Sequence, residues 1–313
     1  MSAILVQAPG LFTTVQDLGR DGFGPLGVSA SGAADPISLR IGNWLVGNPD
    51  GAAALEMTLV GGAFRFERAA VIALTGADFG PSLDGIPAPM WTSIEIHKGQ
   101  TLTLGPSCSG ARAYLCIQGG IAVDPFLGSA STHVLSGLGG FQGRALRRGD
   151  QLELGTANSL FRKRSLSPKA LERLQPRKVV RVTDGPQSDW FANSSSKIFC
   201  ESTFRVAEQS NRMGIRLEGP PIPLDPSREM ITEGVSLGAI QIPPSGQPII
   251  LFVEQQTTGG YPKIANVISA DLHSIGQLRP RDAVRFERIE MSEARSLLIQ
   301  QEALLTSKEL IQE

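Results

Sequence analysis

The segment GRALRRGDQLELG, residues 143–155, joins a basic turn and an aspartate to a short run in which apolar and polar residues alternate. The same arrangement returns in GQLRPRDAVRFER, residues 276–288. Such alternation after a turn is typical of a half-buried β-strand. We therefore expect each segment to supply the strand that closes one half of a duplicated, β-rich chain.

Strand-like runs dominate the rest of the chain. Short apolar stretches such as AVIALTGA (70–77) and QPIILFVE (247–254) are bounded by Gly, Pro, Asp or Asn, the residues that end strands in turns. Helical patterns are confined to residues 34–48, where Asp35 and Pro36 form a helix start, to residues 167–176, and to the tail 292–313. This pattern predicts a mainly β chain of barrels or sandwiches with a few helices.

The length of 313 residues suits two domains, each with its own core. A polar, basic stretch bracketed by strands, residues 156–177, is typical of a linker with one short helix. We expect an N-terminal domain over 1–155 and a C-terminal domain over 178–313, with the tail helix in the second.

Two weaker internal matches accompany the closing strands. QDLGRDG (16–22) parallels EQSNRMG (208–214), which places Arg20 beside Arg212. LEMTLVGGAFRF (55–66) loosely parallels TEGVSLGAIQI (232–242), which places Glu56 beside Glu233. The order of the matches indicates duplication with an insertion in the first half, although chance explains any single match equally well.

Composition excludes several classes of protein. The net charge of −1 leaves no basic footprint for nucleic acid. No apolar run reaches the roughly 18 residues of a membrane span, and the first ten residues do not form a signal peptide, so we expect a cytoplasmic protein with no membrane partner. The three cysteines show no CxxC spacing and are expected to be reduced thiols.

Common catalytic motifs are missing from the sequence. No Gly-Lys is followed by Ser or Thr, so ATP is not expected to bind here through a P-loop. The isolated residues His97, His133 and His273 form no metal-binding pair, and no GxSxG motif is present. The Met-Lys pair that carries biotin is also absent, so this chain is not expected to carry biotin.

Charged residues in apolar surroundings are the first candidates for a site. Arg20, Glu56, Arg212 and Glu233 border apolar strands or turns, where an unpaired charge is costly. They form either two structural ion pairs, Arg20–Glu56 and Arg212–Glu233, or the polar lining of a cleft around a small substrate. The glycine-rich turn at 137–144 offers backbone N–H groups and Arg144 to an anion.

The segment EQQTTGGYPKIA, residues 254–265, is the second candidate. Paired glycines permit a turn with positive φ and the close approach of a ligand, and Pro262 stiffens the exit. The expected substrate-binding residues of this segment are Gln256, Thr257, Gly259, Gly260, Tyr261 and Lys263.

Several long segments together resemble the KipA family, which comprises the C-type component of 5-oxoprolinase, allophanate hydrolase subunit 2-type proteins and the carboxyltransferase-like domain of urea carboxylases. The segments are residues 8–48, ALTGADF (73–79), SGARAYLCIQGGI (109–121), LGSASTH (127–133), GFQGRALRRGD (140–150), GPQSDWF (185–191), 208–221, 232–251 and QTTGGYPKIA (256–265). The chain departs from the family beside these motifs at Glu254, Gln255 and Ala34. The resemblance implies two tandem cyclophilin-like β-barrel domains.

The resemblance also implies a hydrolase subunit that is inactive alone. Relatives act with two further 5-oxoprolinase components, a KipI-type (B-type) protein and an A-type protein, in the ATP-dependent opening of 5-oxoproline, a cyclic amide, to glutamate, with ATP used by the complex. In that reaction Arg20, Glu56, Arg212 and Glu233 would be catalytic and Arg144 would hold substrate. The alternatives are half of a biotin-dependent carboxyltransferase and a regulatory antagonist of a KipI-type kinase inhibitor. Family membership does not choose among them or identify a metal.

Overall fold

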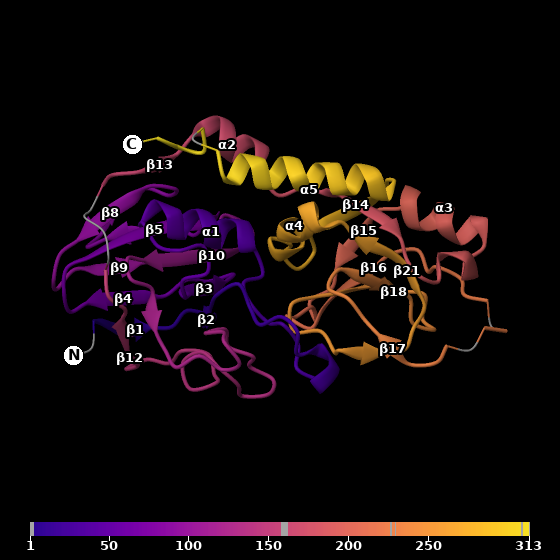
Figure 1. The fold of residues 1–313 in the computed structure, drawn as a ribbon, viewed down its shortest axis with the longest axis horizontal. Helices are drawn as coiled ribbons and strands as arrows, with labels where there is room; N and C mark the ends of the chain where they lie inside the picture. Colours follow the sequence, from indigo (N-terminus) through magenta and orange to yellow (C-terminus); the bar gives the residue numbers. More distant parts are fainter. Residues whose placement is uncertain (1–2, 158–161, 226, 229, 308, 313) are drawn as a thin grey trace. The chain divides into compact units, whose positions relative to one another are not determined.

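A computed structural model of the chain describes residues 3–157, 162–225, 227–228, 230–307 and 309–312. The chain forms two compact units (Figure 1). Unit 1 comprises residues 1–20, 31–174 and 304–313, and unit 2 comprises residues 21–30 and 175–303. Both units are built mainly from β-strands, as the sequence predicts.

Unit 1 contains a seven-stranded and a five-stranded sheet. The first has the order β11 (Ile121–Ala122), β12 (Gln151–Leu154), β1 (Ile4–Ala8), β4 (Ala63–Phe66), β9 (Thr101–Thr103), β6 (Ser82–Leu83) and β7 (Ile86–Pro87). The second has the order β2 (Phe12–Gln16), β3 (Ala54–Thr58), β10 (Ser109–Ile117), β5 (Ala70–Asp78) and β8 (Ser93–Ile96). Side chains of both sheets, such as Phe64 and Leu115, share one buried core.

Helix α1 (Pro36–Leu45) covers the other side of the five-stranded sheet. Its start is fixed by Asp35, whose Oδ1 accepts a hydrogen bond from Ser38 N at 3.0 Å, and by Pro36 in the first turn, as predicted. Leu39 and Ile41 then pack into a second core with Tyr114 of β10.

The predicted linker also contributes regular structure to unit 1. It contains β13 (Ser165–Leu166) and α2 (Pro168–Arg173), and β13 pairs with β23 (Ile311–Gln312) near the end of the chain. Ser167 caps α2 by accepting a hydrogen bond from Ala170 N at 3.2 Å. Residues 158–161 of the predicted linker lie outside the described residues.

Unit 2 is a closed barrel of seven strands. Their order is β14 (Val179–Asp184), β21 (Lys263–Val267), β18 (Ala239–Gln241), β19 (Ile249–Leu251), β16 (Gly214–Glu218), β15 (Phe204–Val206) and β22 (Ala283–Arg288). The parallel pairing of β14 with β22 closes the ring. Phe199 of α3 (Asn193–Glu201) stacks on Phe286 of β22 with ring centroids 4.5 Å apart, which anchors this helix to the barrel.

Short elements complete unit 2 and the chain. A two-stranded sheet pairs β17 (Glu233–Gly234) with β20 (Thr258–Gly259). The remaining elements are α4 (Leu272–Gly276), α5 (Met291–Leu305) and the 3-10 turns η1 (Gly24–Leu26), η2 (Ser188–Trp190) and η3 (Ser269–Asp271). Among the described residues, no helix is long and apolar enough to cross a bilayer.

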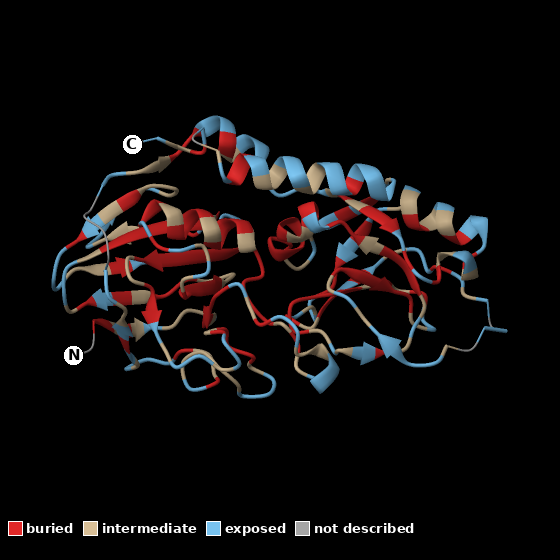
Figure 2. Ribbon diagram, in the orientation of Figure 1, coloured by how far each residue is buried: buried red, intermediate tan, exposed pale blue. Residues whose placement is uncertain are grey.

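The tail helix α5 is exposed along most of its length (Figure 2). Within unit 2, its residue Ala294 is buried against Ile268 and Ala270. Within unit 1, Leu304, Leu305 and Leu310 join the core that contains α1 and α2. The sequence correctly predicts the helix, but it assigns the whole tail to the second domain, whereas residues 304–313 belong to unit 1.

The two closing segments adopt matching turns. Arg147 N donates to Asp150 Oδ2 at 2.7 Å, and Arg279 N donates to Asp282 Oδ2 at 2.9 Å. The next contacts also correspond, because Val6 N donates to Asp150 O at 2.9 Å and Val206 N donates to Asp282 O at 3.0 Å. Structure therefore supports the duplication at this point.

The other two internal matches do not correspond in the structure. If β1 and β2 are equivalent to β15 and β16, Arg20 follows the second strand whereas Arg212 precedes it. Glu56 lies within β3 of the five-stranded sheet, whereas Glu233 lies in the small sheet outside the barrel. These two matches are therefore chance similarities, as the loose spacing allows.

Candidate functional site

The predicted glycine turn lies beside the barrel of unit 2. Strand β20 pairs with β17 so that Gly259 faces Glu233, and Val235 N donates to Thr257 O at 3.1 Å. A Cβ on Gly259 would meet Nε2 of Gln256, so a larger residue here would require the Gln256 side chain to move. The residue with positive φ is Tyr261, at 78°, and the prediction that the glycines adopt it is wrong because pairing with β17 keeps Gly259 in a strand.

Lys263 is the first residue of β21 and is almost completely buried, with 2% of its surface exposed. Its Nζ lies 2.5 Å from Oε1 of Glu233. This ion pair is the one contact of the ammonium with the described residues, although an ammonium carries three donors. Lys263 therefore keeps hydrogen-bonding capacity for another acceptor.

Gln187 holds both partners of this ion pair. Its Nε2 donates to Glu233 Oε1 at 2.9 Å, and its Oε1 accepts a hydrogen bond from Lys263 N at 3.2 Å. Gln187 lies in the motif GPQSDWF, but reasoning from charges in apolar segments did not select it because the side chain is neutral. We define Gln187, Glu233 and Lys263 as the lysine cluster.

The lysine cluster keeps Glu233 ionised. The pKa of the Glu233 carboxyl is lowered, first by its contact with Lys263 and then by the hydrogen bond from Gln187. The carboxylate is 44% exposed, so solvent screens part of this effect. A carboxylate with a lowered pKa is a weak base, and this geometry favours a role for Glu233 in orienting Lys263.

Arg212 is paired with Glu254 and not with Glu233. Its Nε lies 2.5 Å from Glu254 Oε1, and both residues are buried. Glu254 N also donates to Arg212 O at 2.8 Å, which joins the segment before β16 to the segment after β19. The alternative of an Arg212–Glu233 ion pair is therefore wrong, because Lys263 takes Glu233 as its partner.

In unit 1, Arg20 supports a loop. Its guanidinium donates to the carbonyl oxygens of Phe126 and Ser131 and lies 5.6 Å from the centroid of the Phe126 ring. The same loop is held by Asp17, which accepts a hydrogen bond from Ala130 N at 2.6 Å. These contacts give Arg20 a structural role in unit 1.

Glu56 and Arg144 are also engaged within unit 1. Glu56, 1% exposed, accepts hydrogen bonds from Ala34 N at 2.8 Å and Tyr114 OH at 2.6 Å. Arg144 binds Asp150 through two nitrogens at 2.7 and 2.9 Å, which lowers the pKa of the Asp150 carboxyl. This bidentate pair makes the predicted anion-binding turn at 137–144 less available to a ligand.

A pocket of about 430 Å³ opens on unit 2. Its floor is formed by residues of β16, β18 and β19, and its lining mixes carboxamide and apolar side chains. Gln256 and Tyr261 are the predicted site residues that line it. We call this cavity the amide pocket, after its lining residues Gln209, Asn211, Gln241, Gln247 and Gln256.

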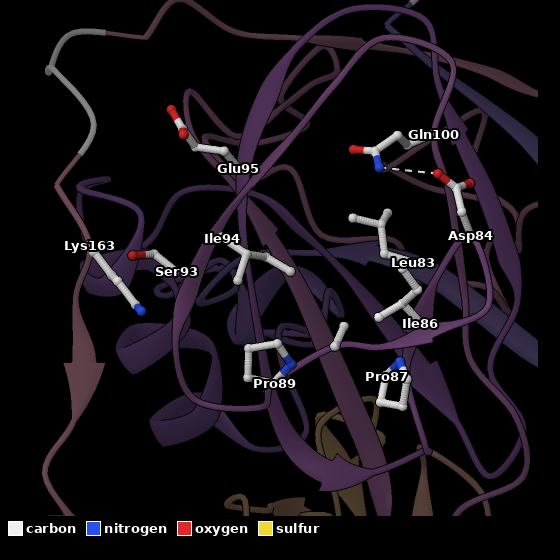
Figure 3. Close-up of a pocket in the computed structure, with 11 residues that line it drawn as sticks. Leu83, Asp84, Ile86, Pro87, Pro89, Ser93, Ile94, Glu95, Gln100 and Lys163 are labelled. Carbon is white, nitrogen blue, oxygen red and sulfur yellow. Dashed lines mark hydrogen bonds between the residues drawn. The ribbon is translucent and has the colours of Figure 1, made fainter.

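A second pocket of about 430 Å³ lies on unit 1 (Figure 3). Its lining is mainly apolar, with Leu83, Pro87 and Ile94 among its residues. At its edge Gln100 Nε2 donates to Asp84 Oδ2 at 3.1 Å. None of the residues predicted from sequence lines it, so the amide pocket and the lysine cluster are the stronger candidate site.

The described residues contain no group of three or more His, Cys, Asp or Glu side chains that could hold a metal ion. The charged residues of the candidate site include two ion pairs, Lys263–Glu233 and Arg212–Glu254. Such a site can bind and orient a polar ligand through hydrogen bonds and fixed charge.

Comparisons with known proteins identify close relatives. The profile of the family described as carboxyltransferase domain, subdomain A and B, matches residues 26–288. The chain is 39% identical over 287 residues to the C-type component of 5-oxoprolinase from Escherichia coli (strain K12), covering 91% of each protein. The Haemophilus influenzae protein of the same name is 37% identical over 284 residues, covering 91% of this chain and 90% of the relative.

A solved structure shares the fold over almost the whole chain. The crystal structure of the K. lactis urea amidolyase superposes with a TM-score of 0.89 and 34% sequence identity. The match covers 97% of this chain but 20% of the urea amidolyase chain. The present chain therefore corresponds to one part of that larger enzyme.

Proposed function

The chain belongs to the carboxyltransferase domain, subdomain A and B, family, and from this we propose that it is the C-type component of an ATP-dependent 5-oxoprolinase. In this proposal it acts in the cytoplasm with a KipI-type (B-type) partner and an A-type partner to convert 5-oxoproline to glutamate. The observation that carries the proposal is the match with the E. coli 5-oxoprolinase component, which covers 91% of both chains.

The proposed reaction needs positive charge and a firmly held lactam. Transfer of a phosphoryl group from ATP to the lactam oxygen releases ADP and activates the ring carbon. Water then adds to that carbon, the C–N bond breaks to release the ring nitrogen as an amine, and a second water releases phosphate. Fixed cations and N–H donors stabilise the charge that develops on the transferring phosphoryl group.

Unit 2 supplies suitable groups for this chemistry. Lys263, held by Glu233 and Gln187, offers an ammonium with hydrogen-bonding capacity left over. Gln256, Thr257 and Tyr261 lie in the adjoining turn, and two of them line the amide pocket. In the proposal Lys263 stabilises charge, Glu233 orients Lys263, and the turn residues contact the lactam.

The test is reconstitution. The chain is mixed with its B-type and A-type partners, and ATP-dependent release of glutamate from 5-oxoproline is followed. We expect Lys263→Ala to lower the rate at least tenfold, since one fixed charge in a catalytic site is worth about 10²-fold. Lys178→Ala, which removes an exposed lysine of unit 2, is the control and should keep the wild-type rate. Absence of glutamate release by the wild-type complex refutes the proposed function.

The carboxyltransferase alternative is favoured by one observation, the match of 97% of the chain to the K. lactis urea amidolyase structure. In that case the chain would serve as half of a biotin-dependent carboxyltransferase, with biotin carried by another protein. The two functions are separated by supplying a biotin carboxylase, a biotinylated carrier and urea. Carboxylation of urea without turnover of 5-oxoproline would favour the alternative.

A further inference from the structure

Two polar side chains in the amide pocket have no role in the proposed function so far. Arg216 of β16 lines the pocket, and its guanidinium makes no hydrogen bond or ion pair with the described residues. Gln241 of β18 also lines the pocket and is 2% exposed. Its Nε2 donates to Gly260 O at 2.8 Å, while its Oε1 has no partner among the residues that the structure describes.

Strand register places these two side chains on one face of the barrel. Arg216 is paired with Ile249 of β19, and Ile249 is likewise opposite Gln241. Residues directly opposite in antiparallel strands share a face, and neighbouring strands lie about 5 Å apart, so the two Cα atoms are about 10 Å apart across Ile249. Lys263 of β21 is opposite Gln241, where the register between β18 and β21 shifts by one residue.

The guanidinium of Arg216 and the carbonyl oxygen of Gln241 favour different groups on a ligand. A guanidinium binds a carboxylate through paired hydrogen bonds. The carbonyl oxygen of Gln241, at the pocket surface of a largely buried side chain, can accept a hydrogen bond from an N–H donor. Glu218, two residues along β16, is the other charged residue of the lining. One positive and one negative charge suit a singly charged ligand better than a polyanion such as ATP.

We propose that the amide pocket binds a small amide that carries a carboxylate, with Arg216 on the carboxylate and Gln241 Oε1 accepting a hydrogen bond from the amide N–H. The proposal rests on the proposed function, in which 5-oxoproline is such a molecule. Arg216 then determines specificity, because urea and simple lactams offer N–H groups but no carboxylate. The pocket volume of about 430 Å³ lies within the usual range for small-ligand sites.

The test is titration calorimetry of the full chain with three ligands: L-5-oxoproline, 2-pyrrolidinone (the same lactam without the carboxylate) and urea. We expect saturable binding of 5-oxoproline, with 2-pyrrolidinone and urea at least about tenfold weaker because the Arg216 contact is missing. Arg216→Gln should lower the affinity for 5-oxoproline to that for 2-pyrrolidinone. It should leave the affinity for 2-pyrrolidinone unchanged. Gln241→Met should weaken both lactams by a similar factor.

The control is Arg285→Gln, which removes an exposed arginine of β22 outside the pocket and should leave all three affinities unchanged. A melting temperature equal to that of the wild type shows that each variant is folded. The inference is overturned if the wild-type chain does not bind 5-oxoproline, if it binds 2-pyrrolidinone equally well, or if Arg216→Gln has no effect.

The outcome is separable from that of the proposed function. The complex can be reconstituted with the Arg216→Gln chain. If it releases glutamate at the wild-type rate and KM, the proposed function stands, but the amide pocket is not the substrate site. Carboxylate-dependent lactam binding by a chain whose complex releases no glutamate would support the pocket and refute the function.

Discussion

The carboxylate of Glu254 forms an ion pair with a buried arginine, Arg212. Glu254 and Arg212 are 5% and 6% exposed, and their backbones are also joined by a hydrogen bond. Taking both charges out of water is costly, and their mutual attraction recovers that cost only while both are present. The pair therefore makes the position intolerant of single changes.

We predict that Glu254→Gln lowers the free energy of unfolding by about 3 kcal/mol, because it removes a buried carboxylate that is ion-paired with the buried Arg212. Urea denaturation measures this difference. The control is Glu208→Gln, which breaks the exposed Arg281–Glu208 pair on the same unit and should change stability by less than about 1 kcal/mol. Equal effects of the two substitutions would show that the Arg212–Glu254 pair contributes no more than a surface contact.

A second prediction concerns Gln187. Gln187→Leu removes a hydrogen bond that favours the ionised form of Glu233, so the pKa of that carboxyl should rise. Lys263→Met should raise it further, because Lys263 is the larger cause of the lowered pKa. An NMR titration of the Glu233 carboxyl measures both shifts. An unchanged pKa in Gln187→Leu would contradict the role given to Gln187.

The sign of the pH dependence follows from the same shift. Because the pKa of Glu233 is lowered in the folded protein, the contribution of the lysine cluster to stability is present above the ordinary pKa of glutamate, about 4.3, and is lost as the pH falls through the lowered value. The lysine cluster is therefore intact at neutral pH.

Sequence reasoning found the charged residues of unit 2 but not their partners. Arg212, Glu233 and Lys263 stand out because they are charges among apolar residues, which is a property of the sequence alone. Which charged residues form ion pairs depends on contacts between segments distant in sequence. Strand β17 pairs with β20, and Glu233 of β17 forms an ion pair with Lys263. Gln187 approaches from a third segment, which periodicity and charge do not reveal.

At the scale of elements, the two glycines at β20, Gly259 and Gly260, differ in the space around them. Gly259 lies against the side chain of Gln256, whereas no atom lies within 4 Å of the position of a Cβ on Gly260. Neither glycine has the positive φ that the sequence suggested, since Tyr261 adopts it. The two glycines therefore make a matched pair for substitution.

We predict that Gly259→Ala displaces Gln256 from its place in the amide pocket and weakens 5-oxoproline binding by about tenfold or less, the cost of one lost hydrogen bond. Gly260→Ala should leave the affinity unchanged, because space is available. Calorimetry of both variants measures the difference. Identical affinities would show that Gln256 does not contact the ligand.

The closing strands β12 and β22 were predictable from sequence for a clear reason. Asp150 and Asp282 each accept a backbone N–H three residues back, and an alternating strand follows each. A turn of this kind depends on residues that are neighbours in the sequence, so the sequence alone can predict it. The loose matches that placed Arg20 with Arg212 and Glu56 with Glu233 had no such local basis, and the structure does not support them.

At the scale of the whole molecule, the family and the mainly β architecture were accessible from long sequence blocks, whereas the composition of the units was not. The tail reads as a helix of the second domain because it follows β22 directly. Its last residues nevertheless belong to unit 1, through burial of Leu304, Leu305 and Leu310 and the pairing of β23 with β13. Contacts between residues so far apart in the sequence cannot be predicted from the local pattern of apolar and polar residues.

We predict that Leu305→Ala lowers the free energy of unfolding by about 2–5 kcal/mol, because it opens a cavity where the side chain is 2% exposed. Ile299→Ala, on the same helix but 58% exposed, is the control and should cost less than about 1 kcal/mol. Thermal and urea unfolding measure both. Similar small losses in both variants would show that the tail is not part of the core of unit 1.

The pairing of β23 with β13 also has a consequence for the order of folding. Residues 175–303 leave the ribosome before residues 304–313, so unit 2 is fully synthesised while unit 1 still lacks its last strand and three core leucines. Domains usually fold in the order in which they are made. Here the synthesis of unit 1 begins first but is completed last. A gene that ends after α2 would encode a form of unit 1 that lacks part of its own core.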